Sequence, residues 1–272
     1  MHTTLQFASL SDVGHIRKRN EDAMLVDPVA GLALVADGLG GSKAGEVASQ
    51  MAVSLLGLAL QPLTAELNEI KATTTEAILE ATLARLDKRL EEEIQAANKT
   101  IYQAAQTQHA QEGMATTLVA ALFGQQHLIS AHVGDSRLYR LRDDCLESLT
   151  RDHSMSQMLT DIGFEAEGVG HRSSMLLRAL GATPFVDIET ALHTLEAGDL
   201  YLLCTDGLTN MLSEEIIFAV LTDNQSAIST GSSRQQERDD LGFISRNLVS
   251  LANAAGGRDN ISIVLVSVTE AR

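Results

Sequence analysis

Short, dense apolar runs recur along this chain, and several of them end beside an aspartate. Their length, their β-branched content and the turn-forming residues around them predict buried or half-buried strands. The runs cover residues 32–35, 118–123, 128–133, 138–141, 201–204 and 261–268. The pattern therefore predicts that sheet structure organises the fold.

Two longer stretches, residues 47–56 and 79–101, instead place apolar residues at helical spacing, so each presents one apolar face. The second has roughly heptad spacing with charged residues between. A coiled-coil dimer is therefore an alternative to packing on a sheet, which is the arrangement we favour. A further helix is expected across residues 241–252, ending near Gly256 and Gly257, because glycine accepts the left-handed conformation that closes helices.

The 272 residues contain no evident repeat or linker, and an apolar content of 44% is ample for one core. We therefore expect a single domain over residues 1–272. Two segments lack an apolar period. Residues 154–175 are irregular and are expected to form a flap, and residues 224–240 are polar and are expected to form a mobile surface loop.

A formal net charge of −16 at pH 7 argues against nucleic acid or an anionic membrane surface as the main partner. The first six residues lack the basic start and apolar stretch of a signal peptide. The longest apolar run, residues 51–60, is well short of the roughly 20 residues that span a bilayer. We expect a cytoplasmic protein that is monomeric.

Four aspartates stand at the ends of predicted strands: Asp37, Asp135 and Asp206 follow strands, and Asp259 precedes one. Any one of them alone is more often part of a turn. Aspartates at strand ends of a common sheet can converge at one edge, where their charges repel unless cations lie between them. Ligation by oxygen alone favours Mg²⁺ or Mn²⁺ over zinc, and a carboxylate can bridge two ions roughly 3.5–4 Å apart.

Residues 12–22 place cations next to carboxylates, and a solvated charged turn is the simplest interpretation. Arg17, five residues before Asp22, nevertheless offers a planar fork of donors for a phosphate, which favours phosphomonoester chemistry over a structural ion site.

The glycine-rich residues 38–43 do not fit a nucleotide-binding loop. A P-loop needs four residues between its first glycine and Gly-Lys-Ser/Thr.

The order and spacing of these segments resemble the signature blocks of the metal-dependent protein phosphatases, the PPM or type 2C family, in their bacterial form. The resemblance covers nearly the whole chain and is specific. Its blocks are residues 11–14 with Arg17, 20–22, 35–41 with 45–46, 115–117, 132–137, 152–154, 178–181, 205–207 and 259–261.

The resemblance implies an α+β fold with a central β-sandwich of two mainly antiparallel sheets, flanked by pairs of antiparallel helices. It also implies hydrolysis of phosphoserine and phosphothreonine by direct attack of a water that bridges two Mn²⁺ or Mg²⁺ ions, with a possible third ion. The expected partners are phosphoproteins and a cognate bacterial Ser/Thr kinase.

Residue by residue, the resemblance implies that Asp37 bridges the two ions and that the Gly38 carbonyl binds the first. Asp206 and Asp259 would bind the second ion. Asp22 would act at this pair or just behind it.

Three further roles follow from the same resemblance. Asp135 would help to hold the third ion together with Asp206. Arg17 would grip the substrate phosphate, and Glu21 is a weaker candidate ligand.

Two positions depart from the family pattern. Leu39 stands where eukaryotic relatives place a histidine proposed to protonate the leaving alcohol, and Ser42 stands where many bacterial members carry a histidine. A metal-bound water or His153 could supply this proton, although His153 is at least as well explained as a structural residue after Asp152.

The alternative function is a catalytically weak, phosphatase-like binding or regulatory module. The complete set of Asp37, Asp206 and Asp259 argues against it.

Overall fold

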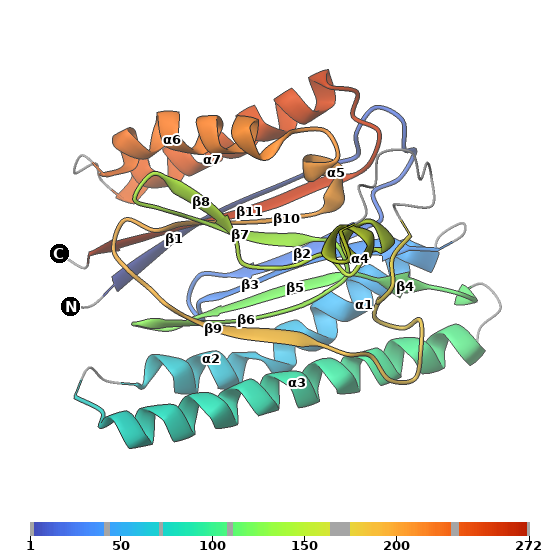
Figure 1. Cartoon of the computed structure of the whole chain (residues 1–272), viewed down its shortest axis with the longest axis horizontal. Helices are drawn as coiled ribbons and strands as arrows, with labels where there is room; N and C mark the ends of the chain where they lie inside the picture. The colour runs from blue at the N-terminus through green and yellow to red at the C-terminus, as the bar shows by residue number, and fades with distance from the viewer. Residues whose placement is uncertain are drawn as a thin grey trace.

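Two antiparallel sheets lie face to face in the computed structural model, and helices cover the outer face of each (Figure 1). The structure describes residues 3–40, 44–70, 73–107, 111–163, 175–229 and 234–270. The layers run helix, sheet, sheet, helix. The α+β sandwich that the resemblance implied is therefore confirmed.

The first sheet places the two ends of the described chain side by side. Its strand order is β1-β11-β10-β7-β8, and all neighbours are antiparallel. Strand β1 pairs with β11 along its whole length, from Thr3 opposite Glu270 to Asp12 opposite Ile261. The strands are β1 (Thr3–Asp12), β7 (Arg137–Arg142), β8 (Cys145–Ser148), β10 (Leu200–Cys204) and β11 (Ile261–Glu270).

The second sheet has the order β2-β3-β5-β6-β9, again antiparallel, and the short β4 also pairs with β3. Its middle strands are the apolar runs that the sequence predicted. The strands are β2 (Asp22–Asp27), β3 (Leu32–Leu39), β4 (Ala115–Thr116), β5 (Leu118–Phe123), β6 (His127–Val133) and β9 (Glu189–Thr194).

Helices form both outer layers. One layer, on the second sheet, consists of α1 (Ala44–Ala59), α2 (Gln61–Asn68) and α3 (Glu76–Thr107). The other, on the first sheet, consists of α6 (Glu214–Ser229) and α7 (Arg234–Ala254). Two short helices, α4 (Met155–Asp161) and α5 (Asp206–Thr209), lie in the connections at one end of the sandwich (Figure 1).

Both faces of each central strand are buried, which explains why the sequence shows continuous apolar runs rather than alternation. On β3, Leu32 and Leu34 pack beneath the helices, whereas Ala33 and Val35 lie between the two sheets. Strand β11 repeats the alternation, with Ile261, Ile263 and Leu265 toward α6 and α7, and Val264, Val266 and Val268 between the sheets.

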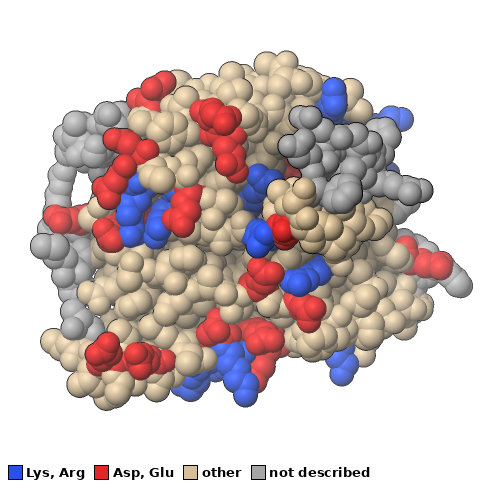
Figure 2. Space-filling model, viewed as in Figure 1, with Lys and Arg blue, Asp and Glu red and all other residues tan. Residues whose placement is uncertain are grey.

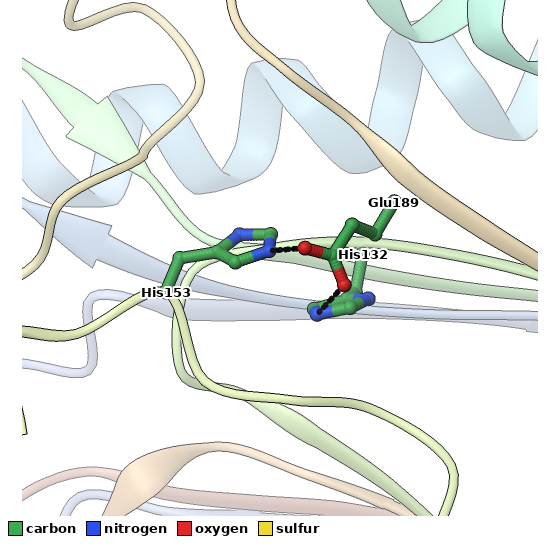
Figure 3. Close-up of side chains that lie close together, drawn as sticks. All are labelled: His132, His153 and Glu189. Carbon is green, nitrogen blue, oxygen red and sulfur yellow. Dashed lines mark ion pairs between the residues drawn. The ribbon is translucent and has the colours of Figure 1, made fainter. Parts of the chain in front are cut away.

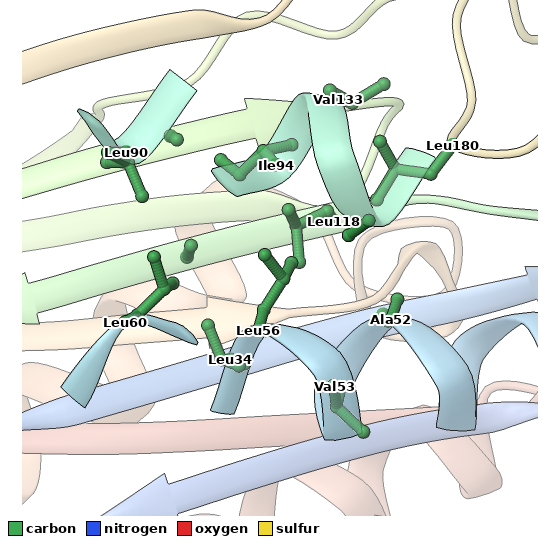
Figure 4. Close-up of a cluster of buried hydrophobic side chains, with 14 of the residues drawn as sticks. Leu34, Ala52, Val53, Leu56, Leu60, Leu90, Ile94, Leu118, Val133 and Leu180 are labelled. Carbon is green, nitrogen blue, oxygen red and sulfur yellow. The ribbon is translucent and has the colours of Figure 1, made fainter. Parts of the chain in front are cut away.

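The long helix α3 packs on its own molecule, as we favoured over a coiled-coil dimer. Leu90 and Ile94 of α3 belong to one buried cluster that also contains Leu56 of α1, Leu60 just after this helix, and Leu118 of β5 (Figure 4). The heptad-like spacing of α3 thus serves an intramolecular interface.

Leu90→Ala should lower the free energy of unfolding by about 2–5 kcal/mol, because the Leu90 side chain is fully buried and its loss leaves a cavity. Leu58→Ala, on a side chain that is 75% exposed, is the matched control and should change stability by less than about 1 kcal/mol. Urea unfolding of both variants measures the difference. Equal effects would contradict the packing of α3 against the sheet.

One prediction was wrong. Residues 224–240 were expected to form a surface loop, but α6 continues to Ser229 and α7 begins at Arg234, so the segment is helical on either side of residues 230–233. Helices anchored in the core can extend through polar residues with good helix propensity, such as glutamine, glutamate and arginine, without an apolar period. Residues 230–233 lie outside the described chain.

In the part of the chain that the structure describes, no single helix is long and apolar enough to cross a membrane. The pair α1 and α2 meets the length and composition criteria only when taken together, and the two are bent by 42° at the break between them. On the molecular face shown in Figure 2, acidic and basic side chains are interspersed.

Candidate metal centre

The aspartates singled out in the sequence meet at one end of the sandwich, with contributions from both sheets. Asp22 opens β2 and lies directly opposite Asp37 of β3, so these two side chains share a face. Strands β10 and β11 are antiparallel neighbours. Asp206, just after β10, and Asp259, just before β11, are therefore placed at the same edge of the other sheet. The strand ends thus gather all four carboxyl groups.

Two buried carboxylate oxygens in this cluster, Asp22 Oδ1 and Asp206 Oδ1, have no hydrogen-bond partner among the described residues. The other oxygen of each is satisfied. Thr205 Oγ1 donates to Asp22 Oδ2 at 2.9 Å, and Asn210 Nδ2 donates to Asp206 Oδ2 at 2.9 Å. Because an unpaired buried oxygen is costly, and a hard cation prefers carboxylate oxygen, the residues present fit a metal ion.

Burial and mutual repulsion raise the pKa values of this cluster. The pKa of Asp22 is raised to about 7, mainly by burial. Repulsion from Asp206 and Asp259 adds to this shift, and hydrogen bonds from hydroxyl groups offset part of it. Burial and the neighbouring carboxylates also hold the pKa of Asp37 well above its ordinary value. The pKa of Asp206 is raised by burial and by the charge of Asp259. Protons and cations therefore compete for the same oxygens.

The backbone of Asp37 and Gly38 is fixed on both sides. Thr116 Oγ1 donates to the Asp37 carbonyl at 2.8 Å, and the Asp37 N–H donates to Thr117 Oγ1 at 2.9 Å. A Cβ at Gly38 would lie 2.2 Å from the Gly45 carbonyl oxygen, so only glycine fits this crossing of β3 and the start of α1. The ligand role of the Gly38 carbonyl stays a prediction.

Asp135 follows β6 and joins the cluster through Asp206. Burial, then repulsion from Asp206 and Asp152, raises the pKa of Asp135 to about 7. Asp152 is itself neutralised by Arg137, whose Nε and Nη2 each donate to one of its carboxylate oxygens at 2.8 Å. Asp135 is thus close enough to Asp206 for their charges to interact. The resemblance would have the two residues share a third ion, and this role also stays a prediction.

Residues 13–21 cross the same end of the sandwich and carry Arg17 to the cluster. The Arg17 Nη2 donates to Asp259 Oδ2 at 2.6 Å, while 51% of the arginine side chain remains exposed. Glu21, the weaker candidate ligand, faces both Arg17 and Asp259, and burial raises its pKa. A half-exposed guanidinium beside buried carboxylates can reach an anion that approaches from solvent.

Behind the Asp135 turn, the structure groups two histidines and a glutamate that the sequence did not bring together. His132 and His153 stack with ring centroids 4.6 Å apart, and His153 Nε2 lies 3.0 Å from Glu189 Oε1 of β9 (Figure 3). His153 Nδ1 accepts the Gly134 N–H at 3.1 Å, so its proton is on Nε2. Burial, then His132, lowers the pKa of His153 to about 4.

These contacts favour the structural interpretation of His153 over a general acid. A ring that is neutral at pH 7 and bonded at both nitrogens holds the turn before Asp135 rather than donating a proton to substrate. His132, His153 and Glu189 each offer a ligand atom within 4.8 Å of the others. His132 Nε2, however, already donates to the Arg151 carbonyl at 2.8 Å, so a metal would have to displace existing hydrogen bonds.

Two parts of the prediction fall outside the described residues: Ser42, and residues 164–174 of the expected flap. Of the flap, residues 155–161 form α4, and its Ser154 side chain caps the first turn by accepting the Gln157 N–H at 3.3 Å. Leu39 is the last residue of β3.

The chain matches the family model described as Protein phosphatase 2C over residues 14–240. It is 37% identical over 265 residues to the serine/threonine phosphatase stp of Listeria innocua, covering 94% of this chain and 93% of the relative. It is 34% identical over 269 residues to the serine/threonine protein phosphatase PstP of Mycobacterium tuberculosis, covering 98% of this chain and 45% of that protein. The chain belongs to the protein phosphatase 2C family.

The fold of this chain is also similar to solved structures of phosphatases. The crystal structure of the Mycobacterium tuberculosis phosphatase PstP superposes with a TM-score of 0.76 at 31% identity, covering 98% of this chain and 99% of that one. The PstP catalytic domain in complex with two manganese ions gives a TM-score of 0.76 at 30% identity, covering 98% and 100%. PppA, a regulatory component of T6SS in Pseudomonas aeruginosa, gives 0.71 at 30% identity, covering 98% and 99%.

Proposed function

We propose that this chain is a metal-dependent serine/threonine protein phosphatase that hydrolyses phosphoserine and phosphothreonine monoesters in proteins. The observation that carries the proposal is the cluster of Asp22, Asp37, Asp206 and Asp259 near the half-exposed Arg17. Two buried carboxylate oxygens of this cluster have no hydrogen-bond partner in the described part of the chain. Membership of the protein phosphatase 2C family and relatives named as serine/threonine phosphatases support it.

The aspartates are proposed to hold two Mn²⁺ or Mg²⁺ ions, because every available donor is oxygen. Asp37 would serve both ions, the Gly38 carbonyl would hold one, and Asp206 and Asp259 would hold the other, with Asp22 acting at the pair or just behind it. Asp135 is proposed to share a third ion with Asp206. When bound, such ions supply a nucleophilic water at neutral pH and neutralise charge that develops on the phosphoryl group.

The chain's own residues orient the substrate. The forked donors of Arg17 match two phosphoryl oxygens, and the ion pair with Asp259 holds the guanidinium beside the aspartates. The side chain of Asn260 fixes the arginine's loop through three backbone groups. The substrates are proposed to be phosphoproteins of a cognate Ser/Thr kinase. The single-domain organisation, the cytoplasmic location and the monomeric state remain predictions.

The test is hydrolysis of p-nitrophenyl phosphate and of a phosphothreonine peptide by EDTA-stripped protein, with Mn²⁺, Mg²⁺, Ca²⁺ or Zn²⁺ added back. Turnover restored by Mn²⁺ or Mg²⁺, and lost in Asp37→Asn, is the expected result. Folded protein that turns over neither substrate with any of these ions would instead support the binding-module alternative.

Arg17→Ala should raise KM for the phosphopeptide by about 10- to 100-fold, the scale of lost charge-assisted hydrogen bonds. The effect on kcat should be smaller, because the proposed ligands remain. Arg17→Lys is the matched variant and should be intermediate, since an ammonium keeps the charge but not the fork. An unchanged KM in the alanine variant would remove Arg17 from the substrate site.

A further inference from the structure

A cavity of about 300 Å³ opens beside the aspartate cluster, and its wall is unusually basic for a chain with a net charge of −16. Three consecutive cations contribute to it, against a single carboxylate. The lining residues are Arg17, Lys18, Arg19, Glu21, Gly40 and Asn260.

The loop that carries these cations is held in place by its backbone. Asn260 Nδ2 donates to the Arg19 carbonyl at 2.8 Å, and the His15 N–H donates to the Gly257 carbonyl at 2.7 Å. Gly14 has a φ of +75°, and a Cβ there would lie 2.3 Å from the Asp259 carbonyl oxygen, so the loop packs directly on the segment before β11. The cations are thus presented by a preorganised backbone, which reduces the entropy lost when they bind a ligand.

The three cations differ in what they already contact. Arg17 pairs with Asp259, a proposed metal ligand. Lys18 and Arg19 are exposed, and neither side chain has a hydrogen bond or an ion pair within the described residues. Glu21 is the acidic member of the wall, and Arg17 and Arg19 both interact with its charge. Two cations without a close partner therefore remain free to attract an anion next to the phosphate site.

We propose that Lys18 and Arg19 form a subsite for a second anionic group of the phosphoprotein substrate, close in sequence to the phosphorylated residue. The group is an acidic side chain or a second phosphoryl group. This inference rests on the proposed phosphatase function, because Arg17 connects the cavity to the phosphate site.

The length of an extended peptide agrees with a subsite at Lys18 and Arg19. An extended peptide advances about 3.3 Å per residue, so a side chain two or three positions from the phosphorylated residue lies roughly 7–10 Å away along the peptide. A substrate bound at Arg17 can therefore extend past the next two cations of the loop. Phosphoproteins with acidic or doubly phosphorylated segments are the substrate class that this surface selects.

The experiment compares phosphothreonine peptides that differ only within three positions of the phosphothreonine: neutral flanks, glutamate on the N-terminal side, glutamate on the C-terminal side, or a neighbouring phosphoserine. The enzymes are the wild type, the double variant Lys18→Gln/Arg19→Gln, and a control, Lys88→Gln/Lys99→Gln. The control removes the same charge from α3, which belongs to the helical layer on the second sheet (Figure 1).

We expect kcat/KM of the wild type to be about fivefold higher for a glutamate-flanked peptide than for the neutral one, the scale of two partly exposed ion pairs. The preference should be larger for the phosphoserine neighbour, which carries up to about two charges. It should disappear in Lys18→Gln/Arg19→Gln, persist in the control, and weaken as salt is added. Turnover of p-nitrophenyl phosphate, which has no flanking residue, should stay within about twofold.

Equal kcat/KM for all peptides in the wild type, or a preference that the double variant retains, would overturn the subsite. Binding of the same fluorescent peptides, followed by anisotropy, tests it separately from catalysis. Loss of p-nitrophenyl phosphate turnover in the wild type would count against the phosphatase function. The anisotropy difference between wild type and double variant would then still support or overturn the subsite.

Discussion

Asp37→Asn should abolish phosphatase activity and at the same time stabilise the metal-free protein. Asparagine keeps the shape of the side chain but removes one charge from a buried group that faces Asp22 and Asp206. Activity should fall by at least about 10³-fold, since the loss of one transition-state donor alone costs 10²- to 10³-fold in other enzymes. The free energy of unfolding without metal should rise, because a buried carboxylate with a raised pKa opposes folding above its unfolded pKa.

Turnover with saturating Mn²⁺ and urea unfolding in EDTA measure the two effects. Asp187→Asn is the matched control, because Asp187 is exposed and the substitution is chemically the same. It should change neither quantity. Turnover like that of the wild type in Asp37→Asn would refute the ligand assignment, and a less stable metal-free variant would show that the carboxylate makes a native contact stronger than the repulsion.

This opposition between stability and function follows from the site itself. In a chain selected only for stability, Asp22 Oδ1 and Asp206 Oδ1 would have hydrogen-bond partners or would lie in solvent. The strain is local, because the backbone around Asp37 is held by Thr116 and Thr117. Because the backbone holds the repelling carboxylates in place, a cation bound between them would offset their repulsion.

The central strands could be predicted because their signal is local. Strands buried on both faces, such as β5 and β11, read as continuous apolar runs, and an aspartate at the end of a run is visible at once. The four outer strands of the two sheets, β1, β8, β2 and β9, were not predicted. Strand β9 (Glu189–Thr194) contains no fully buried residue, so its sequence has neither a dense run nor a clear alternation.

Much of the candidate site depends on contacts between residues far apart in sequence. The sequence shows His153 beside Asp152, but not that it stacks on His132 and bonds Glu189. The pairing of β6 with β9 brings His132 opposite Glu189, and hydrogen bonds to Gly134 bring His153 to them. The clamp from Asn260 to the loop of Arg19 joins residues 241 positions apart. Such pairs are set by strand register and carry no local signal.

Mn²⁺ should stabilise the protein much more at pH 8 than at pH 5.5. The pKa values of Asp22 and Asp135 are raised to about 7, whereas an aspartate in an unfolded chain has a pKa of about 3.9. Between these values the native state holds protons that the unfolded state has lost. The stability of the metal-free protein should therefore fall as the pH rises from about 4 to above 7.

Metal binding has the opposite pH dependence, because the cation needs the deprotonated carboxylates. At pH 8 and a concentration of 100 times Kd, Mn²⁺ should add about 2.7 kcal/mol to the free energy of unfolding, which corresponds to a rise in Tm of roughly 5–10 °C. At pH 5.5, protons bound to the carboxylates should make this rise in Tm severalfold smaller. Thermal unfolding in EDTA and in Mn²⁺ at the two pH values measures it, with Asp37→Asn as the variant in which the rise should be smallest. An equal rise at both pH values would mean that the ion binds outside the aspartate cluster, since Asp22 and Asp135, with pKa values of about 7, must lose protons between pH 5.5 and 8 to accept it.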